Sequence, residues 1–227
     1  GVLAAARPDL LMVVGPAERD GRGPYPQGAA GSFRGFGVDV EVVLGGTATG
    51  GTGISDTDTS GTGTGGTIAG ASAGAEERAS RPLPSSLSVA AWLLDRVRWT
   101  AAPVSGLGVG ESLTAERCVR AGEEIAARSG RVALLVMGDA SACRSVKAPG
   151  YLDERAAGFD QEVARALAAA DAAALKALDA KLASALKAAG RAPWQLLAGA
   201  AGGADLRGEL LFDAAPYGVG YLVATWS

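Results

Sequence analysis

A chain of 227 residues with 48% hydrophobic content can build one α/β domain or two small ones. The formal net charge of −3 argues against a nucleic-acid partner, because no basic stripe is available to displace counterions. The longest apolar runs are strand-sized, which argues against membrane insertion, and two cysteines are too few for a disulfide framework and favour a cytoplasmic protein with free thiols.

The sequence contains no histidine, and this absence narrows the possible chemistry. Without imidazole there is no Ser-His-Asp or Cys-His relay and no iron site of two histidines and a carboxylate. Residues 1–6 (GVLAAA) begin without methionine and resemble the end of a helix whose start is missing. We therefore expect a chain that is truncated at its N-terminus, and a histidine in the missing piece stays an open alternative.

The first part of the chain predicts two strands followed by a long insertion. Residues 10–14 (LLMVV) are typical of a buried strand that ends in a loop, and residues 35–44 alternate enough to predict a second strand ending near Leu44. Residues 45–80 are nearly all Gly, Thr, Ser, Ala and Asp, so we expect a disordered insertion. Within it, GTGTGG at 61–66 lacks the flanking strand and the Gly-Lys-Ser/Thr of a phosphate-binding loop.

Helix and strand alternate in the middle of the chain. Ser85 and Ser86 are predicted to cap a helix that runs through Val89, Trp92, Leu93 and Val97. Residues 106–110 (GLGVG) favour the end of a strand over a dinucleotide fingerprint, because the next helix begins only at Thr114, its predicted cap.

After that helix, which Gly130 is expected to stop, residues 131–137 (RVALLVM) predict the cleanest buried strand of the chain, and it leads into a loop over 138–145.

The last third of the chain predicts helices and then a strand pair. A long helix is expected from near Asp153, and Asp171 is expected to cap the next one. That second helix carries a stripe of leucines at positions 175, 178, 182 and 186. Pro193 suits the first turn of a further helix, and residues 209–213 and 219–224 read as two strands.

These elements predict a single domain over residues 1–227. Strands that alternate with helices indicate an α/β fold in three layers. We expect a mostly parallel or mixed central sheet with helices on both faces, and a C-terminal strand pair. In such folds the functional site lies at the carboxyl ends of the strands.

Two of the predicted strand ends resemble the catalytic B subunit of class III extradiol ring-cleavage dioxygenases. PDLLMVVGP at 8–16 is similar to that family's "PD-apolar strand-P" segment, and VMGDASA at 136–142 with GFD at 158–160 is similar to its "GD-x-S-H … FD" segment. Over most of residues 82–226 the chain more closely resembles an uncharacterised actinobacterial branch of this superfamily. The segments that carry this likeness are APGYLDER at 148–155, RAPWQ at 191–195 and DAAPYGVGY at 213–221.

The resemblance also implies which residues are missing. In the active enzymes, the loop after the first motif supplies a histidine ligand of ferrous iron, whereas here Pro16 is followed by Ala17 and Glu18. The second motif supplies a histidine acid/base where this chain has Ala142. We therefore expect that the iron site has been lost, that no metal or cofactor is bound, and that no residue acts as a ring-cleavage catalyst.

The polar residues that remain near the inferred site predict ligand binding. Asp139, Ser141, Arg144 and Tyr217 are the candidate binding residues, with Arg144 holding a carboxylate or phosphate. Alternatively, Asp139 and Ser141 satisfy backbone donors of their loop, Arg144 pairs with Asp139, and Tyr217 makes a structural hydrogen bond.

Two further features near the site are open to two interpretations. Cys143 is either an inert loop cysteine or a thiol activated by Arg144 or Lys147. An oxygen-only metal site from Glu18 and Asp213 is conceivable, but their spacing does not demand it.

The sequence thus predicts a binding protein for a small ligand or another protein, and homodimerisation is compatible with this role. The alternative is an enzyme in the same cleft, either a ring-cleavage oxidoreductase or one that uses Asp139, Ser141 and Arg144.

Overall fold

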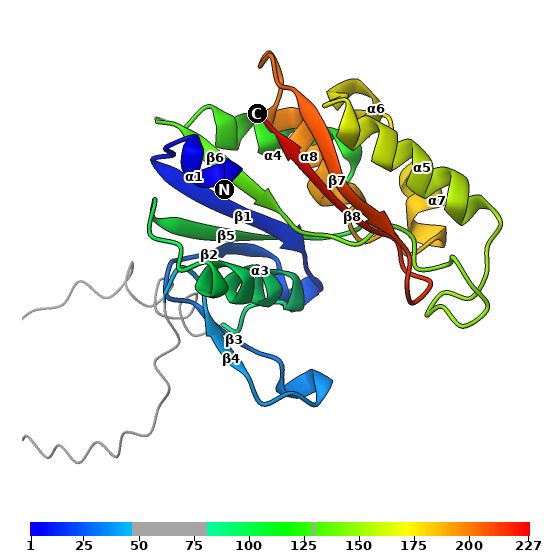
Figure 1. Ribbon diagram of the computed structural model, residues 1–227, viewed down its shortest axis with the longest axis horizontal. Helices are drawn as coiled ribbons and strands as arrows, with labels where there is room; N and C mark the ends of the chain where they lie inside the picture. Colours follow the sequence, from blue (N-terminus) through cyan, green and yellow to red (C-terminus); the bar gives the residue numbers. More distant parts are fainter. Residues whose placement is uncertain (47–80, 129) are drawn as a thin grey trace, which may run out of the picture.

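The computed structural model describes residues 1–46, 81–128 and 130–227 (Figure 1). The predicted insertion over 45–80, with its glycine–threonine tract, lies outside these residues except for Gly45 and Gly46. The predicted α/β class is confirmed. A four-stranded mixed sheet in the order β2-β5-β1-β6 forms the centre, helices surround it, and β7 and β8 form a separate antiparallel pair.

The sheet is built around β1 (Leu10–Pro16), which pairs in parallel with β5 (Val104–Val109) on one side and with β6 (Val132–Val136) on the other. The short β2 (Gly23–Tyr25) joins the β5 edge in the antiparallel direction. β1 is central because its apolar run can be buried on both faces, as parallel strands require. It follows that the carboxyl ends of β1, β5 and β6 meet at one edge of the sheet.

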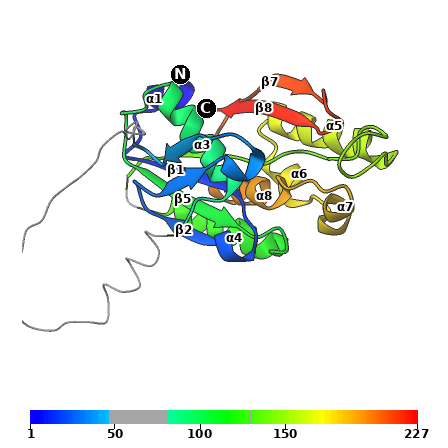
Figure 2. The same cartoon turned by 90° about the horizontal axis from the view of Figure 1, so that it is seen from below.

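Helices cover the two faces of the sheet, as Figure 2 shows. α3 (Ser85–Arg96) packs on the face that carries Leu11 and Val13, together with the small sheet of β3 (Ala30–Ser32) and β4 (Glu41–Val43). α4 (Ala115–Ala126) and α8 (Arg191–Ala200) cover the face that carries Met12 and Val14. The predicted three-layer arrangement is therefore present.

The C-terminal half adds a second group of packed elements beside the sheet (Figure 1). It contains the helices α5 (Arg155–Ala168), α6 (Ala172–Lys176) and α7 (Ala180–Ala185) and the hairpin of β7 (Gly208–Ala214) and β8 (Tyr221–Trp226). The hairpin lies against α5, where the indole Nε1 of Trp226 donates to the carbonyl of Leu167 at 2.7 Å. Single turns complete the described chain: α1 (Val2–Ala5), η1 (Arg19–Gly21) and η2 (Arg34–Phe36).

The predicted cap of α3 was wrong. Pro84 occupies the N-cap position, and no side chain caps this helix; the hydroxyl of Ser86 instead donates to the carbonyl of Pro16 at 2.7 Å. α3 carries apolar residues all round, and the face with the smaller side chains packs on the sheet because it allows closer approach. The buried residues are Leu87, Ser88, Ala90, Ala91 and Leu94. The exposed apolar residues are Val89, Trp92, Leu93 and Val97.

Three other elements differ from the sequence prediction. β4 begins only at Glu41, because η2 interrupts the expected strand. β6 is an edge strand and mostly half-buried, so the most completely buried strand is β1. The leucine stripe is divided between α6 and α7, because the Asp179 carboxylate accepts from the backbone N–H groups that begin α7.

The caps at Thr114 and Asp171 are confirmed, and each accepts the backbone N–H three residues ahead. Among the described residues, every helix is too short or too polar to cross a lipid bilayer.

Candidate ligand-binding site

The candidate site lies where the loop after β6 meets the turn of the β7–β8 hairpin. The backbone N–H of Ala140 donates to the carbonyl of Gly220 at 2.9 Å, and the N–H of Gly220 donates to that of Ser141 at 2.8 Å. The N–H of Arg144 donates to the carbonyl of Gly218 at 2.9 Å. These hydrogen bonds bring the predicted residues 139, 141, 144 and 217 into one region. The sequence separation between loop and hairpin gives no direct sign of this pairing.

Asp160, in α5, accepts three hydrogen bonds from the loop after β6. Its buried carboxylate accepts from the backbone N–H of Ser141 at 2.8 Å and from the Ser141 hydroxyl at 2.8 Å. Nη1 of Arg144 donates to the same carboxylate at 2.9 Å. The alternative in which Arg144 pairs with Asp139 is therefore wrong. Sequence reasoning missed Asp160, although the GFD segment at 158–160 is the signal that could have found it.

Ser141 and Arg144 are consequently poorly placed to act on a ligand. Ser141 is 0% exposed, so its hydroxyl has no contact with solvent. The guanidinium of Arg144 is partly exposed, but its charge faces the Asp160 carboxylate. Both residues hold the loop to α5, and the predicted anion-binding role of Arg144 loses its main support.

Asp139 is placed differently from these two residues. Its carbonyl accepts from the backbone N–H of Gly190 at 2.9 Å, which fixes the loop beside α8, while the residue itself is exposed. The protein atoms around the carboxyl group desolvate it and raise its pKa, although one side stays open to water. Its side chain forms no ion pair with any described residue. Asp139 is therefore a carboxylate whose charge the described part of the protein leaves uncompensated.

The hairpin that pairs with the loop carries two tyrosines. Tyr221 follows Gly220, whose backbone pairs with Ala140 and Ser141, and Tyr217 lies in the turn before it. Burial raises the pKa of the Tyr221 hydroxyl, and the nearby Asp139 and Tyr217 raise it further. Tyr217 is 78% exposed, and no side-chain hydrogen bond of Tyr217 occurs within the described chain, so the structural hydrogen-bond alternative finds no support. Sequence reasoning missed Tyr221, which lies inside the predicted strand 219–224 and begins β8.

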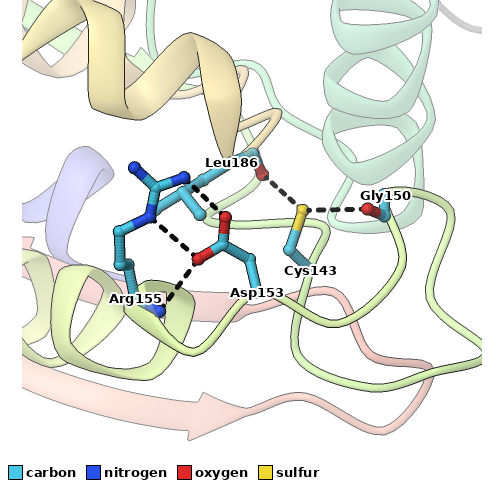
Figure 3. A network of polar contacts seen from close by, with 5 residues as sticks. All are labelled: Cys143, Gly150, Asp153, Arg155 and Leu186. Atoms are coloured by element: carbon cyan, nitrogen blue, oxygen red, sulfur yellow. Dashed lines mark hydrogen bonds and ion pairs between the residues drawn. The ribbon is translucent and has the colours of Figure 1, made fainter.

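Cys143 belongs to a structural network below the loop, drawn in Figure 3. Its thiol, 1% exposed, lies 3.5 Å from the carbonyl oxygens of both Gly150 and Leu186. Burial raises the pKa of this thiol, and the negative charge of Asp153 raises it further. Hydrogen bonds from the side chain and backbone of Arg155 lower the pKa of Asp153 to about 2. The geometry fits the inert alternative, because an activated thiol needs a lowered pKa and access to solvent.

The described residues do not fit the ferrous iron that the family resemblance implies. Such a site needs two imidazoles and a carboxylate, and the sequence has no histidine. Nor do three or more Cys, Asp or Glu side chains of the described chain gather into a group that could hold a metal ion.

Two surface depressions of the described residues lie away from Asp139. One is an open hollow against the β2–β5 edge, lined mainly by apolar atoms of Met12, Pro24, Tyr25, Pro26 and Leu107, with Arg128 at its rim. The other lies around Arg34 and Asp39, whose side chains pair with each other at 2.6 Å. Neither holds several convergent polar groups, the usual sign of a small-molecule site. The chemistry points instead to the open surface at Asp139.

Comparison with known proteins adds no family to this description. The chain matches no protein-family model, and a search of curated proteins finds no relative.

Proposed function

We propose that this protein is a non-catalytic binding protein with a fold like that of the class III extradiol dioxygenase B subunit, and that it holds its ligand or partner at the surface formed by Asp139, Tyr217 and Tyr221. The observation that carries this proposal is the contrast within one loop. Ser141 and Arg144 are committed to Asp160, whereas Asp139 and Tyr217 are exposed to solvent. Exposed Tyr side chains beside a charge are typical of binding surfaces.

Enzymatic use of the same surface is less well supported. A nucleophilic Ser141 needs access to a substrate, and its hydroxyl is completely buried. Asp139 alone is one titratable group, and the described residues place no second acid or base in hydrogen-bond reach of it. The two buried free cysteines are in keeping with the cytoplasmic location that we propose for the protein.

The proposal is tested by measuring iron binding and catechol turnover on the same protein sample. The chain is purified in the absence of oxygen, incubated with Fe(II), desalted, and analysed for metal content and for catechol-dependent oxygen uptake. We expect iron far below one equivalent and no oxygen uptake. Stoichiometric iron together with oxygen consumption would show that the protein is a dioxygenase.

A second measurement addresses binding itself. Native mass spectrometry of the freshly purified chain is expected to show an adduct that is retained by the wild type and lost in Tyr217→Ala. An adduct that survives this substitution would place the binding surface elsewhere. Arg144→Ala is not suitable for this purpose, because it removes the partner of the buried Asp160 carboxylate.

A further inference from the structure

The hairpin of β3 and β4 projects from the body of the protein and ends in the single turn η2 (Figure 1). Residues 33–39 form the end of this hairpin and are called the hairpin tip. Phe36 is 69% exposed there, more than any other phenylalanine of the described chain, and Val38 is 50% exposed. Exposed apolar side chains that gather at one place mark an interaction surface.

The hairpin tip is held in one shape by its own contacts. Nε of Arg34 lies 2.6 Å from Oδ1 of Asp39, and its Nη2 lies 3.0 Å from Oε1 of Glu41. The backbone N–H of Phe36 donates to the carbonyl of Phe33 at 2.8 Å, which closes the turn. A preformed tip loses little entropy when it docks. The two acids and one arginine also leave the tip with one negative charge in excess.

The hollow against the β2–β5 edge has a volume of about 320 Å³ and lies beside α8, which covers β1 and β6. Its lining is mainly apolar, and Arg128 at the rim is its only charged lining residue. It has room for an aromatic ring, although it lacks the convergent polar groups of a small-molecule site. An apolar depression with a charged rim is instead suited to an anchoring side chain of a protein partner.

A partner at this edge must use side chains, because strand pairing is blocked. Pro24 lies in the middle of β2, opposite Leu107, and Pro26 follows the strand. Neither proline has an N–H group to donate to a further strand. The central sheet therefore does not extend into a partner here.

We infer that a second copy of this chain occupies the hollow. Phe36 of one copy enters the hollow of the other, the excess negative charge of its tip faces Arg128, and the same contact is made in return. Apolar surface meets apolar surface, and the two charges are opposite. The lining of the hollow contains no residue of the hairpin tip, so the chain does not fill its own hollow with Phe36. This inference uses surfaces other than the one around Asp139 and is independent of the proposed function.

The small size of each contact requires that both occur together. A stable interface engages about 20–30 residues on each side. The hairpin tip supplies only about seven residues and the hollow about eight. In a reciprocal exchange about a twofold axis each copy contributes both sets, which is enough for a weak dimer with a Kd on the order of 10–100 μM.

Sedimentation velocity of the full chain at roughly 10 μM to 1 mM tests the inference. We expect a monomer–dimer equilibrium that Phe36→Ala weakens at least about 30-fold, because the substitution removes the anchor from both contacts. The matched control is Phe212→Ala, since Phe212 is 49% exposed on the β7–β8 hairpin. This control removes an exposed phenylalanine from another surface and should leave the dimer unchanged.

Charge reversal tests whether the tip faces the rim of the hollow. Arg128→Glu and Glu41→Arg should each weaken the dimer about three- to tenfold, because like charges then meet at the contact. The double variant, in which the two charges have changed places, should recover most of the lost affinity. A role of either residue in folding alone would not produce this recovery.

Three results would overturn the inference. A chain that stays monomeric up to about 1 mM would mean that the hollow does not receive a second copy. A dimer that Phe36→Ala leaves unchanged would use another surface, and species larger than a dimer would show that the exchange is not closed. Circular dichroism shows whether each variant has kept its fold. If Phe36→Ala fails to fold, Pro26→Trp fills the hollow without altering the tip and should abolish the dimer equally.

Discussion

Asp160 and Ser141 are joined by two hydrogen bonds of 2.8 Å, although they lie 19 residues apart in the sequence. The carboxylate belongs to α5 and the serine to the loop that follows β6, so this contact fastens the second group of helices to the end of the central sheet. Because Arg144 donates to the same carboxylate, one buried acid satisfies three donors of the loop. The position of the whole candidate site therefore depends on Asp160.

Asp160→Ala is expected to lower the free energy of unfolding by about 3 kcal/mol. The substitution leaves the backbone N–H and hydroxyl of the buried Ser141 without an acceptor and removes the partner of Arg144. Urea unfolding followed by circular dichroism measures the change. Glu162→Ala, an exposed acid on the same helix, is the control and should change the stability by less than about 0.5 kcal/mol. Equal effects of the two substitutions would refute this role of Asp160.

A pair of glycine substitutions tests the packing of α4 on α8. A Cβ on Gly122 would collide with the backbone of Leu196 and Ala200, so Gly122→Ala should destabilise the protein by about 2 kcal/mol. Gly158, in α5, has open space around its Cα, and Gly158→Ala should stabilise the protein by about 0.5–1 kcal/mol because alanine favours the helix. Thermal unfolding of the two variants should thus give shifts of opposite sign. A rise in Tm for Gly122→Ala would mean that the two helices do not approach so closely.

The elements that the sequence predicted well are those with local signals. Residues 10–14 and 131–137 are apolar runs of strand length, and Thr114 and Asp171 are caps whose acceptors lie three residues from their donors. The buried face of α3 could not be predicted, because this helix carries large apolar side chains on more than one side and only the tertiary packing decides which of them are buried. The short β2 and β3 were not predicted, because three residues carry too little pattern.

The candidate site was predicted in part for a similar reason. The loop with Asp139, Ser141 and Arg144 follows a recognisable strand, so its position at the end of the sheet could be expected. The ion-pair partner of Arg144 could not be expected in this way. Whether Arg144 faces Asp139 or Asp160 depends on how α5 packs beneath the loop, which no local pattern encodes. Tyr221 joins the site only because Gly220 permits the close approach of the hairpin.

Both cysteines should be unreactive in the folded protein. Burial raises the pKa of Cys118 and of Cys143, and both side chains are almost inaccessible to solvent. Reaction with 5,5′-dithiobis(2-nitrobenzoate) at pH 8 should therefore be about 100-fold slower, or more, in buffer than in concentrated urea. Rapid labelling of one thiol in buffer would identify it as accessible and contradict the structural role of the Cys143 network.

Asp139→Asn should raise the stability of the protein at neutral pH. Desolvation gives Asp139 a higher pKa in the folded protein than its ordinary value of 3.8, so the folded state holds this proton more tightly than the unfolded chain does. The stability linked to this group is therefore present below pH 3.8 and is lost as the pH rises through the folded pKa.

Removing the ionisable group should abolish this loss. We expect Asp139→Asn to raise Tm at pH 7 by about 1–2 °C, a small gain because solvent screens the exposed carboxylate, and to have no effect near pH 3. Asp205→Asn, which removes an exposed carboxylate from the loop before β7, provides the baseline for removing one negative charge. A lower Tm for Asp139→Asn at pH 7 would mean that the carboxylate has a stabilising partner.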